Sequence, residues 1–578
     1  MALILRNGGS QSPDRWLKEP RNNQLDVEKV RRRKVVDYKS EQDIKYIDLA
    51  DNLKTLNISN NHLIFGRRGS GKTTLILASV KRNDNIVTAI DVQSMKNDNS
   101  LNIIIKIMLQ VLFDVQENFR GYFNEIETKY KIQYKGVRGF GCWLLRKRDK
   151  EIKVRYEEGK KYLELLKKEI DLIRKLNLAP EEITYIISQE GRQTNSTLFR
   201  KEYVSESKDS MDIEVKLQGQ YKIIESKINF SMNAMESYSY NNVSEIKDES
   251  SSEIKTSFTR TYRKQELLLE QRDSISFLLN EIERITKQHI FVYLDDFYQI
   301  PMKNQPEIIQ YLHDIYKNCR NNSFCFKIAT LPYRLRMNQE GSVDMSYKDD
   351  FSTIKLDYDL SELDRTKDYL LSILVNINPV LHISKQDIET LFNNSEVLIY
   401  TIIATGGVPR DFLLMFVELV KTARLDNKTT IQKEHVYTVV KSLRDDKDNN
   451  IEYDSDISPD LIREAVEILK EDVVGKMNTN VILYPKLLVD KHEALLKNLT
   501  NLRYLHVIKD STTSENRKKE EFEAYLVDMS FYAVNKRLKP GLDFRRFWET
   551  DSKSRLTQLR QSKIWSFPDE LLEKYKIS

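Results

Sequence analysis

The sequence contains few of the residues that interrupt helices. Only 17 glycines and 12 prolines occur among its 578 residues, whereas the two types together make up about 12% of an average protein. Because both residues disfavour helix interiors, their scarcity favours long helices. The chain is also several times longer than a domain of roughly 100–200 residues, so we expect two to four domains.

Cysteines and long apolar runs are scarce as well. The three cysteines, Cys142, Cys319 and Cys325, have no metal-ligand spacing, and their odd number argues against a disulfide framework. No apolar run approaches the ~18 residues of a membrane helix, and the apolar run in residues 1–6 is too short for a signal peptide. We therefore expect a cytoplasmic protein that has no membrane partner.

The sequence also lacks an excess of one charge. Lys and Arg number 92 and Asp and Glu 87, a net charge of +5 that does not by itself indicate nucleic acid binding. Residues 129–150, however, are locally basic with interleaved aromatic rings. Such a segment either tracks a nucleic acid backbone and stacks on bases, or is a charged helix whose rings pack against a neighbouring arm. The residues concerned are Lys129, Lys131, Lys135, Arg138, Arg146, Lys147, Arg148 and Lys150, with Tyr130, Tyr134, Phe140 and Trp143.

The hydrophobic pattern places an α/β core on both sides of a long insertion. An apolar run at 63–65 precedes a glycine-rich turn, a helix from Lys72 and a strand at 86–92, which is a β-loop-α-β order. Further core strands are expected at 290–294, 324–330 and 353–356. The expected units are an N-terminal arm (1–40), the core (41–127 and 288–358), the insertion (128–287), a helical lid (359–445), a C-terminal unit (458–540) and a basic, aromatic tail (541–578).

The insertion is expected to be mostly helical. Apolar residues at heptad-like spacing among Lys and Glu predict a helix over 148–176, and a similar pattern predicts a return helix over 261–287. Alternating apolar residues between 213 and 230 predict a β-hairpin. The insertion therefore reads as a helical arm that carries a hairpin.

Residues 66–73 match the phosphate-loop pattern GxxxxGK[ST] directly after an apolar strand and at the start of a helix. The glycines allow backbone amides to surround phosphate oxygens, and the helix N-terminus adds partial positive charge. Lys72 is expected to reach the β and γ phosphates, and the Thr73 hydroxyl to bind magnesium. We expect ATP and Mg²⁺ as cofactors. The expected nucleotide-binding residues are Gly66, Arg67, Arg68, Gly69, Ser70, Gly71, Lys72, Thr73 and Thr74.

Two carboxylates follow the apolar strand at 290–294. A magnesium–phosphate site needs an acid at the end of a neighbouring buried strand, and Asp295 is expected to fill that role. Asp296 is expected to orient or deprotonate the attacking water. The alternative is that the two acids merely begin a surface helix.

Together these motifs resemble the AAA+ superfamily, most closely the branch of origin-recognition initiator ATPases and STAND signalling ATPases. Three further features contribute to the resemblance. They are the strand at 324–330, which ends on a polar residue, the helical lid that follows the core, and the sequence Gly-Gly-Val-Pro-Arg at 406–410. It implies a three-layer α/β P-loop NTPase core with a helical lid. It also implies that the chain assembles into a homo-oligomer or a multi-protein complex.

The resemblance also implies roles for residues outside the phosphate loop. Thr330 corresponds to the sensor that contacts the γ phosphate or the attacking water, and Arg410 to the lid arginine that reports on the same phosphate. The alternative for 406–410 is helix punctuation, with Arg410 solvated. Arg334 and Arg336 are either an arginine finger or ordinary surface arginines.

Beyond the lid, the expected order of three helices and a two-stranded wing resembles a winged helix. If it binds DNA, the helix with His492 and Lys497 is expected to enter the major groove, with basic wing residues near phosphate. Winged helices also serve as protein-docking modules, and the tail adds only a modest basic excess. The basic wing residues are Arg517, Lys518 and Lys519.

These observations predict an ATPase that works as a switch. Nucleotide state is expected to be coupled to binding of DNA or a protein partner, as in DNA remodelling or anti-phage defence. The typical hydrolytic pair of the superfamily is Asp-Glu, and Asp296 is one methylene shorter, so slow turnover is expected. The alternative is a nucleotide-gated scaffold or signalling protein with little turnover.

Overall fold

The computed structural model describes the chain from residue 46 to residue 575 with internal gaps. No helix within this described part is long and apolar enough to span a bilayer. The N-terminal arm expected over 1–40 and the hairpin expected at 213–230 lie outside the described residues. The described ranges are 46–48, 50–135, 149–179, 182–188, 257–339, 345–357, 360–377, 383–449, 451–454, 457–534, 536–548 and 552–575.

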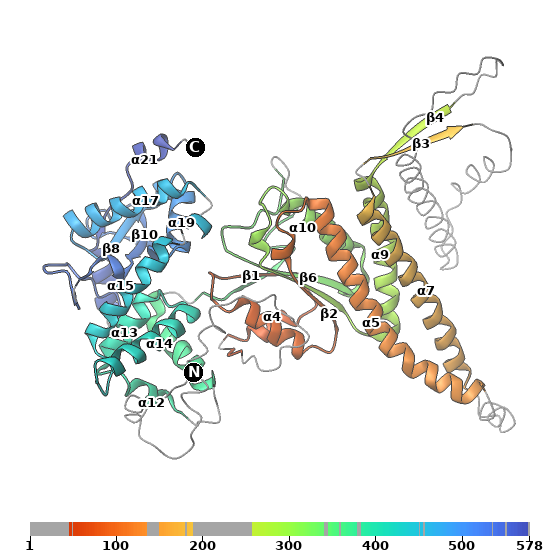
Figure 1. The fold of residues 1–578 in the computed structure, drawn as a ribbon, viewed down its shortest axis with the longest axis horizontal. Helices are drawn as coiled ribbons and strands as arrows, with labels where there is room; N and C mark the ends of the chain where they lie inside the picture. Colours follow the sequence, from red (N-terminus) through yellow and green to blue (C-terminus); the bar gives the residue numbers. More distant parts are fainter. Residues whose placement is uncertain are drawn as a thin grey trace.

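A five-stranded sheet forms the centre of the molecule (Figure 1). All of its neighbouring strands pair in parallel. Because the carboxyl ends of parallel strands lie at one edge, the segments that follow these strands meet there. In spatial order the strands are β2 (Ile86–Asp91), β5 (Ile290–Asp295), β6 (Phe324–Thr330), β1 (His62–Phe65) and β7 (Ser352–Lys355).

Helices cover both faces of this sheet because its strands are apolar on both sides. In β5, Phe291 and Tyr293 pack with α3 (Asn52–Leu56) and α4 (Lys72–Lys81). The intervening residues of β5 face the opposite core, which contains α5 (Ser100–Tyr134), α9 (Lys264–Thr286) and α10 (Gln305–Asn318). Near-continuous apolar strands are typical of parallel sheets buried on both faces. The predicted α/β core with a layer of helices on each side is confirmed.

The insertion forms an arm that projects from the core. α5 has 35 residues and is about 50 Å long, and α7 (Lys150–Leu178) packs along it, close to the helix expected over 148–176. Figure 1 shows the pair extending away from the sheet. β3 (Glu182–Ser188) pairs antiparallel with β4 (Ser257–Arg263). The expected return helix is therefore slightly shorter, because residues 261–263 belong to β4 and α9 begins at Lys264.

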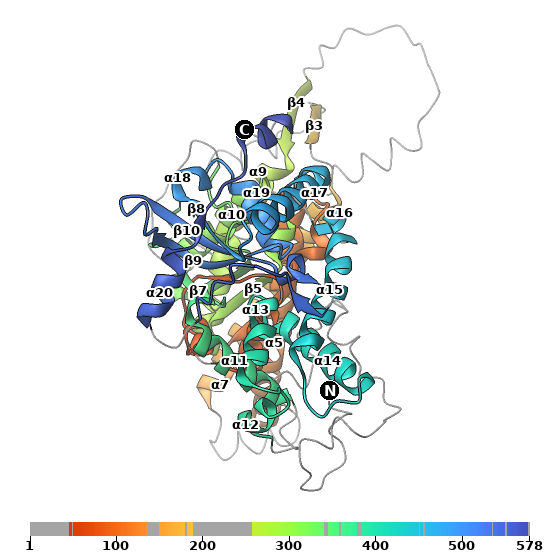
Figure 2. The same cartoon turned by 90° about the vertical axis from the view of Figure 1, so that its left-hand side faces the viewer.

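The lid and the C-terminal unit share one hydrophobic core. The same cluster of buried side chains runs from Leu360 to Leu572 and includes residues of the lid helices and of the C-terminal sheet. Figure 2 shows β8, β9 and β10 above the lid helices α11, α12 and α14. The lid helices are α11 (Leu363–Ile377), α12 (Lys385–Glu389), α13 (Ser395–Ala404), α14 (Pro409–Leu425) and α15 (Lys433–Asn449).

The C-terminal unit contains the three helices and the hairpin that were expected, and two further strands join the hairpin in its main sheet. The sheet order is β13-β8-β10-β9. β13 comes from the segment expected to be a separate tail, and it pairs in parallel with β8. The tail is therefore part of this unit rather than a separate segment, because β13 joins the sheet and Phe547, Trp548 and Phe567 are buried in the shared core. The elements are α17 (Pro459–Ile468), β8 (Val481–Pro485), α18 (Lys486–Val489), α19 (Glu493–Asn501), β9 (Leu505–Thr513), β10 (Glu521–Val527) and β13 (Lys563–Ile564).

Candidate functional site

The glycine-rich turn lies between β1 and α4, and its glycines are required by its geometry. Gly69 and Gly71 have φ angles of 85° and 101°, in the left-handed region that side chains disfavour. At Gly66, an added Cβ would overlap the Ser70 hydroxyl. Gly71 is the N-cap of α4, so the turn delivers the chain directly to the helix N-terminus. This is the arrangement in which backbone amides and a helix end attract an anion.

Lys72 and Thr73 both have specific partners at the start of α4. Lys72 Nζ donates to the carbonyl oxygens of Gly66 (2.6 Å) and Arg67 (3.1 Å), so its ammonium group lies beside the turn. Thr73 Oγ1 donates to Asp295 Oδ2 at 2.6 Å. The Thr73 and Asp295 side chains are 222 positions apart in the sequence, and the fold brings them together at the carboxyl edge of the sheet.

The donor set around Thr73 fits a hard divalent cation. A hydroxyl and a carboxylate oxygen are the oxygen ligands that magnesium uses, with phosphates and water completing its shell. Nearby, the Ser70 hydroxyl is buried and has no hydrogen-bond partner among the residues that the structure describes. Since buried polar groups are almost always paired, this unpartnered hydroxyl also fits a polar ligand on the turn. Thr74, the next residue of α4, is half-buried.

Asp295 and Asp296 end the buried strand β5. Asp296 adopts a left-handed conformation (φ 55°), in which Asp is tolerated, and its N–H donates to Asp295 Oδ1 at 2.9 Å. It precedes a short turn of 3₁₀ helix, Phe297–Gln299. Both acids are almost fully buried. They therefore do not begin an exposed surface helix, which was the alternative interpretation.

Thr330 and Arg410 also lie at the turn. Thr330 ends β6 in register with Phe65, and its carbonyl oxygen accepts a bond from Gly66 N at 3.4 Å. Arg410 is the second residue of α14, and its N–H donates to the Gly69 carbonyl at 3.3 Å. A Cβ on Gly69 would lie 2.8 Å from Arg410 Cβ. Pro409 is the first residue of α14, so residues 406–410 do end one helix and begin the next. The same start of α14 places Arg410 against the phosphate loop.

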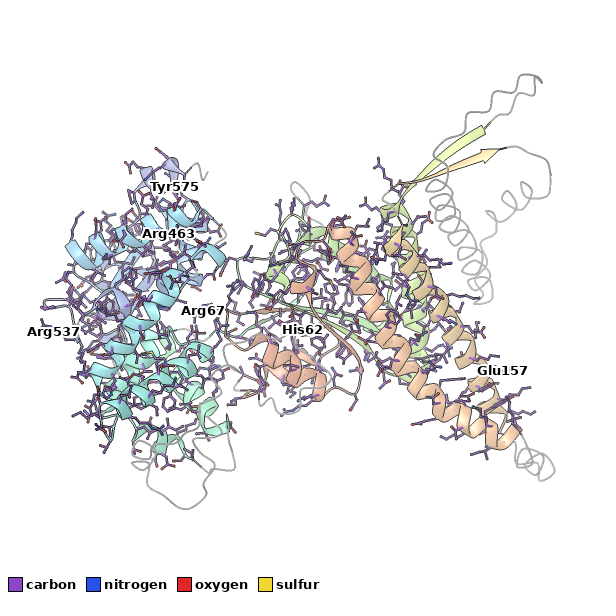
Figure 3. All side chains as sticks on the ribbon, in the orientation of Figure 1. His62, Arg67, Glu157, Arg463, Arg537 and Tyr575 are labelled. Atoms are coloured by element: carbon purple, nitrogen blue, oxygen red, sulfur yellow. The ribbon has the colours of Figure 1, made fainter. Side chains whose placement is uncertain are left out.

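Arg67 links the turn to two further segments. Its backbone N–H lies 2.9 Å from both carboxylate oxygens of Asp357, and its Nε lies 3.3 Å from Asp357 Oδ1. One terminal NH₂ donates to the Gly406 carbonyl at 3.1 Å. Figure 3 shows Arg67 on the side of the core that faces the lid. Asp357 was not expected, although its place just after β7, at the carboxyl edge, is a signal that could have identified it.

Tyr298 is a second residue that the motifs did not indicate. Its buried ring lies 5.4 Å from the Arg68 guanidinium and 5.9 Å from Lys72 Nζ. Both distances are within reach of a cation–π interaction. The ring therefore lies close to the cations of the phosphate loop, because Tyr298 belongs to the short 3₁₀ turn that follows Asp296.

The two arginines after β6 lie in a loop within the same chain. Arg336 N–H donates to Gln305 Oε1 at 2.9 Å, and its Nε contacts the Asn338 carbonyl at 3.4 Å. Arg334 supplies the carbonyl oxygen that the Thr330 hydroxyl contacts at 3.4 Å. Both side chains are half-buried. Their described contacts are with neighbouring segments of the same chain.

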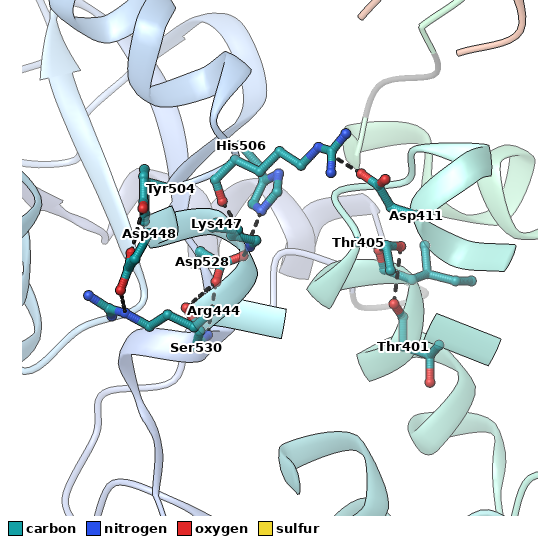
Figure 4. Close-up of polar contacts among 12 residues, drawn as sticks. Thr401, Thr405, Asp411, Arg444, Lys447, Asp448, Tyr504, His506, Asp528 and Ser530 are labelled. Carbon is teal, nitrogen blue, oxygen red and sulfur yellow. Dashed lines mark hydrogen bonds and ion pairs between the residues drawn. The ribbon is translucent and has the colours of Figure 1, made fainter. Parts of the chain in front are cut away.

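The lid and the C-terminal unit meet next to Gly406, where the His506 ring packs against this glycine. Arg503 forms an ion pair with Asp411 at 2.8 Å. Lys447 on α15 lies 2.6 Å from the buried Asp528, which is also 3.2 Å from His506 Nε2 (Figure 4). Burial alone raises the pKa of Asp528, but Lys447 and His506 outweigh it and hold that pKa below its usual range. Burial lowers the pKa of His506.

The expected DNA-reading helix is not free in this arrangement. His492 is completely buried, where it contacts the Tyr484 hydroxyl and Asp569, so it cannot contact a base. Lys497 pairs with Glu493, and its Nζ lies 5.6 Å from the Tyr333 ring of the core. His492 is therefore not available as a base-reading residue of the helix that was expected to enter the major groove. The wing residues Arg517, Lys518 and Lys519 are exposed.

The aromatic residues of the arm tip are partly used within the arm. Tyr130 stacks on Tyr156 of α7 with ring centroids 3.9 Å apart, and Tyr134 stacks on Tyr130 at 5.0 Å. Lys131 pairs with Glu127 at 3.0 Å. For Tyr130, packing against the neighbouring helix is the better interpretation, and Tyr134 and Lys131 contact residues of α5 itself. The rest of the basic segment, 136–148, lies outside the described residues.

Comparisons with known proteins add no relative on which to base an assignment. The sequence matches no protein-family model, and no curated protein shows significant similarity to it. The geometry of the turn and its neighbours therefore has to support the function alone.

Proposed function

We propose that the protein binds ATP with magnesium at the phosphate loop, residues 66–73, and hydrolyses it slowly as an AAA+-type switch. The observation that carries this proposal is the 2.6 Å contact between Thr73 Oγ1 and Asp295 Oδ2 beside Lys72. A hydroxyl at a helix start, a strand-end carboxylate and a lysine on a glycine-rich turn are the groups that a magnesium–triphosphate needs.

Each residue has a distinct task in this proposal. The amides of the loop and the N-terminus of α4 hold the phosphates, and Lys72 exchanges the carbonyls of Gly66 and Arg67 for phosphate oxygens. Magnesium, held by Thr73 and Asp295, supplies positive charge that offsets the charge of the β and γ phosphates. Asp296 orients the attacking water as general base, and Thr330 and Arg410 contact the γ phosphate.

The packing of the lid supports a switch. Arg410 and Gly406 contact the phosphate loop, and both belong to the unit that shares one core with the C-terminal sheet. Packed cores resist gradual deformation. A change at the γ phosphate that displaces Arg410 therefore moves lid and C-terminal unit together, and this motion alters the surface offered to DNA or a protein partner, or to other copies of the chain.

A nucleotide-gated scaffold with little turnover is the second candidate. The burial of Asp296 favours the scaffold, because this carboxylate is only 1% exposed. An attacking water reaches such a buried base only if it enters the site together with the nucleotide. The partner in this case is a protein docked on the C-terminal unit. The burial of His492 and the contact of Lys497 with the core favour a protein partner over DNA on α19.

Phosphate release by the purified full chain tests the proposal. We expect slow turnover for the wild type and none for Lys72→Ala. Asp296→Asn should bind ATP normally but lose roughly 10²- to 10⁴-fold in turnover, because it removes a general base. If both wild type and Asp296→Asn bound ATP and hydrolysed it equally slowly, the scaffold would be favoured. The same assay with added DNA shows whether DNA stimulates turnover.

A further inference from the structure

Arg67 occupies an unusual position for a phosphate-loop residue, because its contacts lead away from the loop. Its backbone N–H and its Nε both contact the Asp357 carboxylate. A terminal NH₂ of its guanidinium group donates a hydrogen bond to the Gly406 carbonyl. The side chains of Arg67 and Asp357 are only 17% and 27% exposed, so water competes weakly for these charge-assisted bonds. One arginine thus joins the loop, the segment after β7 and the lid.

The Gly406 carbonyl is a fixed point of the lid. Gly406 and Gly407 end α13 in left-handed conformations, and their N–H groups donate to the carbonyls of Ile403 and Ile402 at 3.0 Å. This arrangement closes a helix C-terminus, where carbonyl oxygens carry partial negative charge. The Arg67 cation therefore contacts a helix end that favours positive charge.

The opposite side of Gly406 is held by the C-terminal unit. An added Cβ at Gly406 would overlap the His506 ring of β9. His506 is in turn held by the buried Asp528. Gly406 is thus enclosed between Arg67 of the core and His506 of the C-terminal unit, and its carbonyl cannot retreat from Arg67 without moving that unit.

We propose that Arg67 and Asp357 are positioning residues that latch the lid to the phosphate loop and so retain the bound nucleotide. This inference rests on the proposed function, because it assigns a task at the same site. A nucleotide whose phosphates lie between the loop and Arg410 leaves when the lid separates from the loop. Separation breaks the bond from Arg67 to Gly406, and Asp357 holds the arginine fork in the orientation that makes this bond.

The competing role for Arg67 is direct binding of phosphate, and Asp357 distinguishes the two. If Arg67 bound phosphate directly, Asp357 would only hold its guanidinium group back. Asp357→Asn would then free Arg67, and nucleotide binding would tighten or stay the same. A latch needs both partners, so Asp357→Asn and Arg67→Ala should accelerate release to similar extents. Their combination should add little, since residues of one network are not additive.

Release of fluorescent mant-ADP from the full chain, chased with excess unlabelled ADP in a stopped-flow instrument, measures the latch. Hydrogen bonds to charged groups predict release roughly 10- to 100-fold faster for Arg67→Ala, Asp357→Asn and the double variant, with association nearly unchanged. Arg67→Lys, which keeps the charge but loses the fork, should release at an intermediate rate. Lys54→Ala, at an exposed position on α3, is the matched control and should release like the wild type.

The outcomes separate the latch from the proposed function. If both single variants released ADP at the wild-type rate, the latch would be overturned. The proposed function would still stand, because the chain would still bind ADP. Slower association with unchanged release in Arg67→Ala would assign Arg67 to phosphate binding instead. Absence of ADP and ATP binding in the wild type would overturn the proposed function and the latch with it.

Discussion

Replacement of Lys447 by methionine should destabilise the joint between lid and C-terminal unit. Lys447 lies on α15, and its Nζ is 2.6 Å from Asp528 Oδ2 and 3.2 Å from the Arg503 carbonyl. The Asp528 side chain is fully buried, whereas that of Lys447 is 16% exposed. Methionine retains most of the apolar stem but removes the charge, which leaves the buried carboxylate without its cation.

The size of the effect follows from burial. Removal of one partner of a buried ion pair costs about 3–5 kcal/mol. Asp528 keeps three bonds, from the Ser530 N–H at 3.0 Å, from the Ser530 hydroxyl and from His506 at 3.2 Å, so we expect the lower end, about 3 kcal/mol. Lid and C-terminal unit share one core and together span about 200 residues, for which 1 kcal/mol shifts Tm by roughly 2–4 °C. The transition of this unit should therefore fall by about 6–12 °C.

Differential scanning calorimetry at pH 7 checks this expectation. Lys441→Met, at an exposed position of the same helix, is the matched control and should leave Tm nearly unchanged. Adding Asp528→Asn to Lys447→Met should recover part of the loss, because the buried charge is then absent. A Tm within 2 °C of wild type for Lys447→Met, or an equal drop in the control, would refute the reasoning.

Two further predictions concern other parts of the fold. Burial lowers the pKa of Lys327 from 10.5 to about 7, so the unfolded chain binds the extra proton between these values and stability rises there by about 1.4 kcal/mol per pH unit. Lys327→Met should flatten the rise of Tm between pH 7.5 and pH 9, and an unchanged slope would contradict this origin. Gly406→Ala should cost about 1–3 kcal/mol in chemical denaturation, because the added methyl group meets His506 in a left-handed conformation; wild-type stability would show that this contact is absent.

The parts of the site that are local in sequence could be predicted. Residues 66–73 carry their own backbone requirements, and Asp295 and Asp296 follow a buried strand, so neighbouring residues alone identify them. Arg67 and Asp357 are different, because their contact joins positions 290 apart. The place of Asp357 just after a strand assigns it to the carboxyl edge of the sheet, but nothing in the local pattern specifies which arginine it will meet there.

In the C-terminal unit, the sequence pattern likewise did not predict which residues are buried. His492 lies at the start of an amphipathic helix, a position that is often exposed, yet the folded tail brings Asp569 to it. The tail, residues 541–578, was expected as a separate basic and aromatic segment. Its aromatic residues instead pack into the shared core, and hydrophobic burial of several large rings outweighs the charge pattern.

The most direct test of the central claim is equilibrium binding of ATP with and without magnesium. Isothermal titration calorimetry of the full chain should show ATP binding that weakens when magnesium is removed. Lys72→Ala should abolish binding, while Lys81→Ala, at the other end of α4, should bind like the wild type. Equal ATP affinity of wild type and Lys72→Ala, or no heat of binding with either, would contradict a nucleotide site at this loop.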